Sequence, residues 1–514
     1  MASDGDFKPE LRLHPLSWLF ALTTFIRQFI VPVIAFIIFG ARNDAEIWGA
    51  LIIVPLLIGA LWQQWLYRYG FGPRGLVINE GLFFRNVRQI EYPRIENIDV
   101  KRGLLHRLLG VAEVSIATST GGKAEATIRV LSLEATQQLR DHVFTRSQPA
   151  ESRETVDAED EVLLNLPPAE LIRFGLIDNR GMIVVAALFG FLYQAGAFEL
   201  SRQAAEAWFG DSRLNHLAAL GIAMQAGLAL AGVITFILAL RLLSVGFALV
   251  TLFDFTLTRH GQDLRVRHGL LTRLALTLRI RRIQSVHQTE SLLHRLFGRV
   301  SLRVDLAGDS GSSDDGKQKS QVRTRWLAPI CTPVQASALL AIALPDVDPT
   351  TQPDWQPLAA GARMRLFRHS LYFALIVTGA AAAALHLLPE APFRPDARWI
   401  AIFLLGMALI GWWRAHVYVK HTRWALTPDA ILFRYGWLTR RLIVTPRNRL
   451  QSVKLTASPF DRRHRMANVS IDTAGGGMNS SIYVRFLPRD IAQALAVRLY
   501  HSHIDVARRR ATAG

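Results

Sequence analysis

RRIQSVHQTESLLHRLFG occupies residues 281–298, and two similar stretches occur in the same chain: YPRIENIDVKRGLLHRLLG at 92–110 and RNRLQSVKLTASPFDRRHR at 447–465. Arg94 precedes His106 by the same interval as Arg282 precedes His294, and a glycine follows each histidine at the same distance. In the third stretch Asp461 takes the place of the histidine, and no glycine follows. Three copies of one block in a single chain predict three copies of one module.

The sequence around each block predicts the same order of elements. Before the block come alternating apolar and polar residues interrupted by a turn, as in RGLVINEGLFFR from Arg74, FTLTRHGQDLRVRHGLLTR from Phe255 and WALTPDAILFRYGWLTRR from Trp424. After it come VSIATST, VSLRVDLAG or VSIDTAGG, a turn and a return strand. A helix then closes each copy, beginning at Ser132, Thr332-Pro333 or Pro488. Each module is therefore predicted to be an antiparallel sheet covered by one C-terminal helix.

Apolar residues make up 50% of the 514 residues and charged residues only 19%, which favours a membrane protein with soluble parts. Six runs are about long enough to cross a bilayer, which takes roughly 20 residues. They form three pairs with shorter connections within the pairs than between them: Leu16–Gly40 with Ile47–Tyr67, Gly181–Phe198 with Leu217–Leu240, and Leu371–Leu388 with Trp399–Val419. The first run is too long and too deep in the chain for a signal peptide, so we expect it to be retained.

The net charge of +18 follows this membrane pattern. The three predicted hairpin tips have no basic excess, whereas the long segments carry many basic residues at their flanks, among them Arg68, Arg259, Arg368 and Lys420. By the positive-inside rule, both termini and all three modules are expected on the cytoplasmic side. Nucleic-acid binding is not expected, because the charge is spread over three tethered modules and no nucleic-acid-binding motif occurs.

Short motifs shared by the copies resemble a known family. The L-T pair recurs at Leu257-Thr258 and Leu426-Thr427, the G-L/W-L-T-R turn at 269–273 and 436–440, and the R-I/L-Q-S-V block at 282–286 and 449–453. These motifs are similar to those of the second bacterial pleckstrin-homology-like (PH-like) family, in the triple, membrane-embedded arrangement of YdbT-type proteins. The resemblance covers nearly the whole chain and implies PH-like barrels tethered to a bacterial inner membrane, with no established chemistry. The first copy departs most, with Ile95-Glu96-Asn97-Ile98 in place of the Q-S-V element.

The predicted fold class combines membrane α with α+β: six transmembrane helices in three hairpins, each followed by a cytoplasmic PH-like β-barrel or sandwich with a C-terminal helix. The expected order is a hairpin at 1–67, a PH-like domain at 68–146, an acidic linker at 147–180, a hairpin at 181–253, a domain at 254–345, a linker at 346–369, a hairpin at 370–420, a domain at 421–505 and a basic tail at 506–514.

The repeated arginines Arg94, Arg282 and Arg449 are the first candidate binding residues. A guanidinium matches the geometry of a phosphate, so they are candidates for binding anionic lipid headgroups or an acidic partner. The alternative is an internal ion pair or backbone hydrogen bond that fixes a loop of the module.

The third module has a denser basic cluster with few acidic residues nearby: Arg440, Arg441, Arg447, Arg462, Arg463 and Arg465. A tethered domain is already close to the anionic leaflet. The cluster is therefore expected to orient the domain or to concentrate an acidic ligand.

Arg27 and Gln28 lie within the first apolar run. A charge at the bilayer centre costs at least about 2.5–3.5 kcal/mol, so one reading makes them an intramembrane polar site. The other reading starts the span near Phe29, with Arg27 at the headgroups. Arg241 similarly marks the expected cytoplasmic end of the fourth span, with 242–253 continuing along or below the interface.

No motif for catalysis or for binding a metal or cofactor is found. The histidines have no ligand spacing, the single cysteine Cys331 has no fixed histidine partner, and the glycine-rich stretches lack the lysine of a P-loop. The leading hypothesis is a non-enzymatic membrane protein whose modules bind anionic lipid, a membrane-protein partner or another copy, as an envelope scaffold or in stress or antimicrobial defence. The alternative is a transporter for a lipid or peptide, gated by the modules, with Arg27 in its path.

Overall fold

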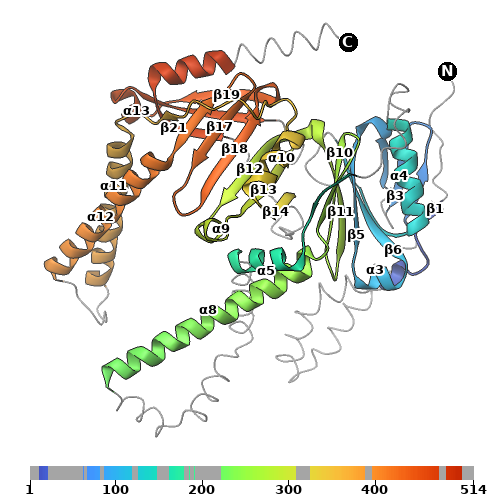
Figure 1. Ribbon diagram of the computed structural model, residues 1–514, viewed down its shortest axis with the longest axis horizontal. Helices are drawn as coiled ribbons and strands as arrows, with labels where there is room; N and C mark the ends of the chain where they lie inside the picture. Colours follow the sequence, from blue (N-terminus) through green and yellow to red (C-terminus); the bar gives the residue numbers. More distant parts are fainter. Residues whose placement is uncertain are drawn as a thin grey trace. The chain divides into compact units, whose positions relative to one another are not determined.

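The computed structural model describes residues 11–20, 66–80, 86–118, 126–147, 161–178, 221–307, 325–387, 396–473 and 482–499, together with positions 62, 185 and 190. The chain divides into two compact units, Met1–Leu278 and Arg279–Gly514. Figure 1 shows the strands and helices of both units, coloured along the sequence.

Unit 1 contains two antiparallel sheets. The first has the order β1-β2-β3-β4 and the second the order β7-β6-β5-β11-β10-β9-β8. Their strands are β1 (Leu11–Arg12), β2 (Arg68–Phe71), β3 (Gly75–Glu80), β4 (Asn86–Glu91), β5 (Ile95–Arg102), β6 (Val111–Thr118), β7 (Ala126–Ser132), β8 (Glu161–Asn165), β9 (Thr256–His260), β10 (Asp263–His268) and β11 (Arg273–Arg279).

Unit 2 follows the same plan. A seven-stranded sheet has the order β14-β13-β12-β18-β17-β16-β15, and a three-stranded sheet the order β19-β20-β21. Their strands are β12 (Ile283–Glu290), β13 (Val300–Leu306), β14 (Trp326–Cys331), β15 (Gln356–Pro357), β16 (Arg423–Leu426), β17 (Ala430–Tyr435), β18 (Arg440–Pro446), β19 (Leu450–Thr456), β20 (Met466–Thr473) and β21 (Ile482–Pro488).

Three PH-like repeats account for these strands. Each repeat contributes four strands, then three strands, and then a C-terminal helix: α4 (Leu133–Ser147), α10 (Pro333–Ala343) or residues 489–499. Two predicted helix starts are confirmed, because the hydroxyls of Ser132 and Thr332 accept hydrogen bonds from the backbone N–H groups of Ala135 and Gln335. A short helix follows the fifth strand of each repeat: α3 (Leu104–Leu108), α9 (Leu292–Leu296) or α13 (Pro459–Arg463).

The repeats share sheets, whereas the sequence predicts three separate modules. Strand β5 of the first repeat pairs with β11 of the second, and β12 of the second pairs with β18 of the third. Figure 1 shows each pair side by side. Each seven-stranded sheet is therefore built by two successive repeats.

Both predicted linkers contain structured segments. The segment 147–180 holds β8, which pairs with β9, and helix α5 (Pro168–Ile177). The segment 346–369 holds β15, which pairs with β16. Strand β1 pairs with β2 in the same way. In each repeat, a short strand before the predicted hairpin therefore pairs with the first strand after that hairpin. The repeat therefore begins before its membrane hairpin.

Three described helices are long and apolar enough to span a membrane: α8 (Ile222–Leu252), α11 (Ala362–Leu387) and α12 (Ala397–His421). They coincide with the predicted runs Leu217–Leu240, Leu371–Leu388 and Trp399–Val419. The other three predicted runs lie almost wholly outside the described residues, so six helices in three hairpins remain a prediction.

Helix α8 is longer than a bilayer requires. Its 31 residues extend about 46 Å, against a hydrocarbon core of about 30 Å. Helix α5 packs against its C-terminal part, where the Arg241 guanidinium donates a hydrogen bond to the Leu176 carbonyl at 2.9 Å and Ala248 and Leu252 are buried. The last turns of α8 therefore belong to the packed part of unit 1.

Candidate membrane-surface site

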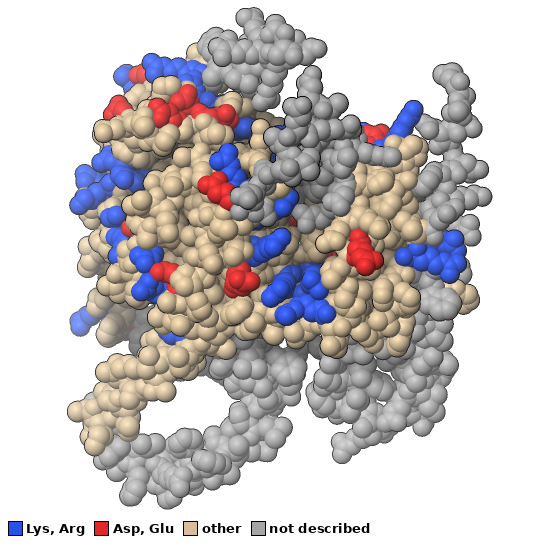
Figure 2. Space-filling model, turned by 45° about the vertical axis from the view of Figure 1, so that its right-hand side comes forward, with Lys and Arg blue, Asp and Glu red and all other residues tan. Residues whose placement is uncertain are grey.

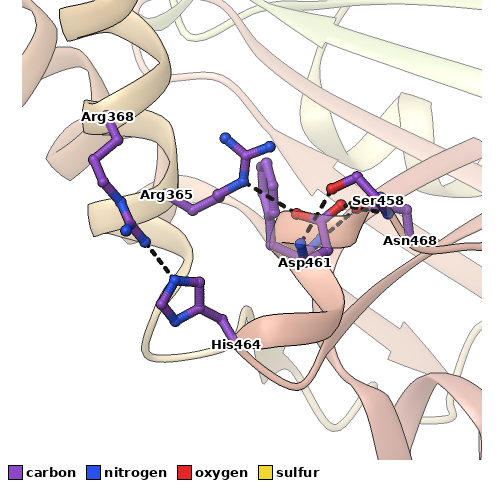
Figure 3. Close-up of polar contacts among 7 residues, drawn as sticks. Arg365, Arg368, Ser458, Asp461, His464 and Asn468 are labelled. Carbon is purple, nitrogen blue, oxygen red and sulfur yellow. Dashed lines mark hydrogen bonds and ion pairs between the residues drawn. The ribbon is translucent and has the colours of Figure 1, made fainter.

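A set of polar contacts joins α13 of the third repeat to the first turns of α11 (Figure 3). The Arg365 Nε donates to Asp461 Oδ1 at 3.2 Å, and the other carboxylate oxygen of Asp461 accepts from the backbone N–H of Ser458 at 3.1 Å and from Asn468 Nδ2 at 3.3 Å. The Ser458 hydroxyl accepts from the Asp461 N–H, completing a reciprocal cap at the start of α13. The buried Asp461 therefore stabilises the start of α13 and also attaches α13 to α11.

The pKa of Asp461 reflects these contacts. Burial alone would raise it, but the hydrogen bonds from Ser458 and the charge of Arg365 outweigh burial and lower the pKa below its ordinary value of 3.8. The carboxylate is therefore ionised at neutral pH.

A second contact lies one turn further along α11. Arg368 Nη2 and His464 Nε2 are 2.6 Å apart, so the chain that follows α13 also touches the first part of α11 (Figure 3). Arg462, Arg463 and Arg465 are exposed in this segment. Because α11 carries its arginines in its first turns and is apolar afterwards, these exposed arginines lie beside the end at which the helix would leave a membrane.

Aromatic side chains surround the same ends of α11 and α12. Phe367 and Trp412 make an edge-to-face contact at 5.3 Å, and the Arg363 guanidinium lies over Trp412 at 5.2 Å. Trp413 contacts Trp437, which lies in the turn at 436–439, at 5.0 Å. Tryptophan is enriched where a membrane meets water, so this turn lies at the level expected for an interface.

The corresponding turn of the second repeat contacts α8 through backbone hydrogen bonds. The Gly269 N–H donates to the Phe253 carbonyl at 2.7 Å, and the Leu270 N–H to the Val250 carbonyl at 2.9 Å, at the C-terminal end of α8. Gly269 has a φ of +111° and Gly436 a φ of +92°, a region that favours glycine. The glycines of the G-L/W-L-T-R motif therefore allow a tight turn, which contacts α8 through its backbone in the second repeat and α12 through Trp437 in the third.

The short helices and these turns also expose apolar side chains. Leu108 of α3 is 81% exposed, Leu296 of α9 is 76% exposed and Phe460 of α13 is 61% exposed. Leu270, Leu271 and Leu438 in the two turns are exposed as well. Side chains of this kind are suited to contact a bilayer interface.

The repeated arginines have internal contacts. Arg449 donates to the Arg281 carbonyl and forms an ion pair with Asp346 at 3.2 Å. Arg94 forms an ion pair with Glu91 at 3.2 Å. Arg282 also takes part in an interaction. The contacts of Arg449 fit the alternative in which such an arginine fixes a loop, whereas Arg94 and Glu91 form an exposed pair. Headgroup binding by the repeated arginines remains a hypothesis.

The other predicted cluster residues fall into two groups. Arg447 donates to the carbonyls of Pro428 and Arg498 at 3.0 and 3.2 Å, so its guanidinium links two segments of the third repeat. Arg440 is 3.8 Å from Glu290, and Arg441 lies over Tyr435. Figure 2 shows Lys and Arg side chains in several separate groups on one face of the protein. The segment at 462–465 lies beside α11 through the contacts of Asp461 with Arg365 and of His464 with Arg368.

Some predicted site features stay untested. Arg27 and Gln28 lie outside the described residues. The transport hypothesis, which depends on Arg27, therefore stays a hypothesis. Among the residues that the structure describes, no group of three or more His, Cys, Asp or Glu side chains is placed to hold a metal. Cys331 is buried, with its Sγ 3.7 Å from the Val300 carbonyl.

The role of His294 and Asp461 was missed from the sequence. His294 makes the same reciprocal cap with Ser291 that Asp461 makes with Ser458, and each side chain accepts from the N-cap N–H. The signal was present as Ser-x-x-His and Ser-x-x-Asp, a capping-box spacing. Arg365 gave no such signal, because its partner is distant in sequence.

Comparison with known proteins agrees with the three repeats. The family model described as "Bacterial PH domain" matches residues 21–147, 214–327 and 373–503. The chain is 22% identical to UPF0699 transmembrane protein YdbT of Bacillus subtilis (strain 168) over 496 residues, which cover 92% of this chain and 94% of the relative. No solved structure matches the chain.

Proposed function

Since the chain belongs to the bacterial PH domain family and is a membrane protein, we propose that it is a non-enzymatic scaffold whose third PH-like module binds anionic phospholipid headgroups. The proposed setting is the bacterial inner membrane, with six spans in three hairpins and with both termini and all three modules in the cytoplasm. The proposed role is to organise the envelope, including under stress or antimicrobial attack.

The contact between Arg365 and Asp461 carries this proposal. It supports a position for Arg463 and Arg465 next to the membrane end of α11, where an anionic leaflet would surround them. A basic residue near such a surface contributes about 1 kcal/mol, and a guanidinium can hold a phosphate through two hydrogen bonds. Because α11 and α12 already hold the module in place, headgroup binding would set its orientation rather than recruit it.

Photo-crosslinking of lipid to the full chain in nanodiscs tests the proposal. The discs contain phosphatidylcholine with either a photoactivatable phosphatidylglycerol or a photoactivatable phosphatidylcholine probe. The wild-type chain should label preferentially with the anionic probe at peptides containing 462–465, and added salt should reduce this preference. The Arg463→Gln/Arg465→Gln variant should label on the order of tenfold less with the anionic probe.

A control variant of equal charge is Lys454→Gln/Arg498→Gln, which changes two exposed residues of the same repeat. It should keep the labelling of the wild type. Equal labelling by both probes, insensitive to salt and to the arginine substitutions, would disprove headgroup binding.

A further inference from the structure

The two internal junctions between repeats are built in the same way. When the three blocks are aligned on Arg94, Arg282 and Arg449, the residues that follow these arginines, Ile95, Ile283 and Leu450, are equivalent. Tyr92, Ile280 and Arg447 are equivalent by the same alignment. Arg102 then lies opposite Arg273 in the first junction, and the equivalent Glu290 lies opposite Arg440 in the second. The following pairs also correspond, with Val100 opposite Ala275 and Gln288 opposite Leu442. The fifth strand of one repeat thus pairs with the fourth strand of the next in one fixed register.

Among the described strands, one fourth strand and one fifth strand have no neighbour on their outer edge. Strand β4 is the fourth strand of the first repeat and ends the sheet β1-β2-β3-β4. Strand β19 is the fifth strand of the third repeat and ends the sheet β19-β20-β21. In the described part of the chain, no strand pairs with the outer edge of either one. Such edges present unpaired backbone N–H and C=O groups to a complementary strand.

Side chains on β4 and β19 are exposed at positions where a neighbouring strand would cover them. Ile443 and Val444 of β18 are buried within the second junction, and Leu276 and Thr277 of β11 are buried next to the paired residues of the first. The equivalent Arg88 and Gln89 of β4 are exposed. Two apolar side chains are exposed at equivalent junction positions, Val87 at 61% and Leu455 at 41%. The register of the internal junctions would place these two side chains opposite each other.

A side chain contact that accompanies each internal junction is also missing at the end of the chain. Arg107 of α3 donates to the Leu270 carbonyl of the next repeat at 2.8 Å, and Arg295 of α9 donates to the Trp437 and Leu438 carbonyls at 3.0 and 3.1 Å. Arg462 of α13 holds the equivalent position. Among the described residues its exposed guanidinium makes no hydrogen bond or ion pair.

We infer that β19 of one copy of this chain pairs antiparallel with β4 of a second copy, with Leu455 opposite Val87, Thr456 opposite Asn86 and Lys454 opposite Arg88. This contact repeats the internal junction and is head to tail, so further copies can add in the same way. Confinement to one membrane raises the effective concentration of the two edges. The pairing does not depend on headgroup binding.

The like charges of Lys454 and Arg88 oppose the pairing and offer a sharp test of the register. The first internal junction tolerates a like-charged pair of this kind, with Arg102 opposite Arg273. Reversing one charge should convert repulsion into attraction, whereas reversing both should restore repulsion. A surface that does not pair would show no such alternation.

Disulfide trapping of the full chain in membranes tests the contact. In a Cys331→Ala background, one tagged copy carries Val87→Cys and a differently tagged copy carries Leu455→Cys. Directly opposed residues have Cβ atoms about 4.5–5.5 Å apart, close enough for a disulfide after small adjustment. Mild oxidation should join the two tags. Tyr483→Cys is the control partner, because Tyr483 is exposed on β21 at the other end of the same sheet.

The charge series is measured in the same assay. Lys454→Glu in the Leu455→Cys copy should raise the cross-linked fraction about 2–5-fold, and adding Arg88→Glu to the other copy should return it toward the starting value. Arg462→Ala should lower it. The inference is overturned if Tyr483→Cys cross-links equally well, if the tags do not join, or if a chain with both cysteines closes only on itself. An effect of Lys454→Glu that Arg88→Glu does not reverse would overturn the register.

Discussion

At the scale of single residues, the Asp461 carboxylate makes three structural contacts. It caps α13, holds Asn468 and forms an ion pair with Arg365 while its own side chain is 4% exposed. Removing one partner of a buried, hydrogen-bonded charge leaves the other uncompensated, which is more costly than losing a surface pair. The attachment of the third repeat to α11 therefore depends on this residue.

Asp461→Asn is expected to destabilise the protein by about 1–3 kcal/mol, because it leaves Arg365 without its ion pair. Thermal unfolding of the full chain in detergent measures the effect. Arg463→Gln, an exposed substitution in the same segment, should change the free energy of unfolding by no more than about 0.5 kcal/mol. Equal melting of the two variants would contradict the structural role of Asp461.

The lowered pKa of Asp461 predicts a dependence of stability on pH. A carboxylate with a lowered folded-state pKa contributes stability that is present above its ordinary value of 3.8 and is lost as the pH falls through the folded-state pKa. The difference in melting temperature between wild type and Asp461→Asn should therefore be constant from about pH 7 to 5 and shrink below 3.8. If the difference in melting temperature instead grew as the pH fell, the pKa of Asp461 would be raised in the folded protein rather than lowered.

At the scale of elements, the packing of α5 on α8 depends on one glycine. A Cβ atom on Gly175 would lie 2.5 Å from the Val245 Cα and 3.0 Å from its backbone nitrogen, so the two helix backbones approach too closely for a side chain. This contact and the hydrogen bond from Arg241 to Leu176 hold α5 against the C-terminal part of α8. Helix α5 thus fixes the segment before the second hairpin to the segment after it.

Gly175→Ala is expected to force α5 away from α8 and to cost about 1–3 kcal/mol. Hydrogen exchange of the α5 amides in the full chain should rise, and the melting temperature should fall. Gly246→Ala is the matched control, because it adds the same methyl group to exposed helix with nothing within 4 Å. If both substitutions behave alike, the close approach of the helices does not limit stability.

At the scale of the whole molecule, a PH-like repeat of this chain is not a separate domain. The core of the third repeat includes Leu358, Ala359 and Ala362, which precede α12, and β18 takes β12 of the second repeat as its neighbour. Arg449 likewise depends on Asp346. A fragment that begins after the hairpin would lose the core residues that precede α12, and its β18 would lose the neighbouring strand β12.

Fragments 352–514 and 423–514 should therefore differ in stability. The longer one keeps β15, α11 and α12 and loses only the contacts to the second repeat, whereas the shorter one also loses part of its core. Protease resistance of β18 and β21 should fall in the order full chain, 352–514, 423–514. Equal resistance of the short fragment and the full chain would mean that the third repeat folds independently.

Local patterns in the sequence were sufficient for the repeat, its strands and two of its helix caps. Alternation of apolar residues specifies a strand, and a serine or threonine before a helix specifies its start, because both effects act between neighbours along the chain. The three described membrane helices were predictable for the same reason, since about 20 apolar residues suffice to cross a bilayer.

Contacts between distant residues decided the rest. The strand pairs β5 with β11 and β12 with β18 have no local signature, because an edge strand and a paired strand share the same alternation. Arg365 and Asp461 are far apart in the sequence, so only the fold shows that α13 lies against α11. The sequence by itself determined three membrane-tethered PH-like repeats. Only the tertiary structure decided that they share sheets, since pairing depends on which strands meet in space. It also shows β4 and β19 at the ends of their sheets among the described strands.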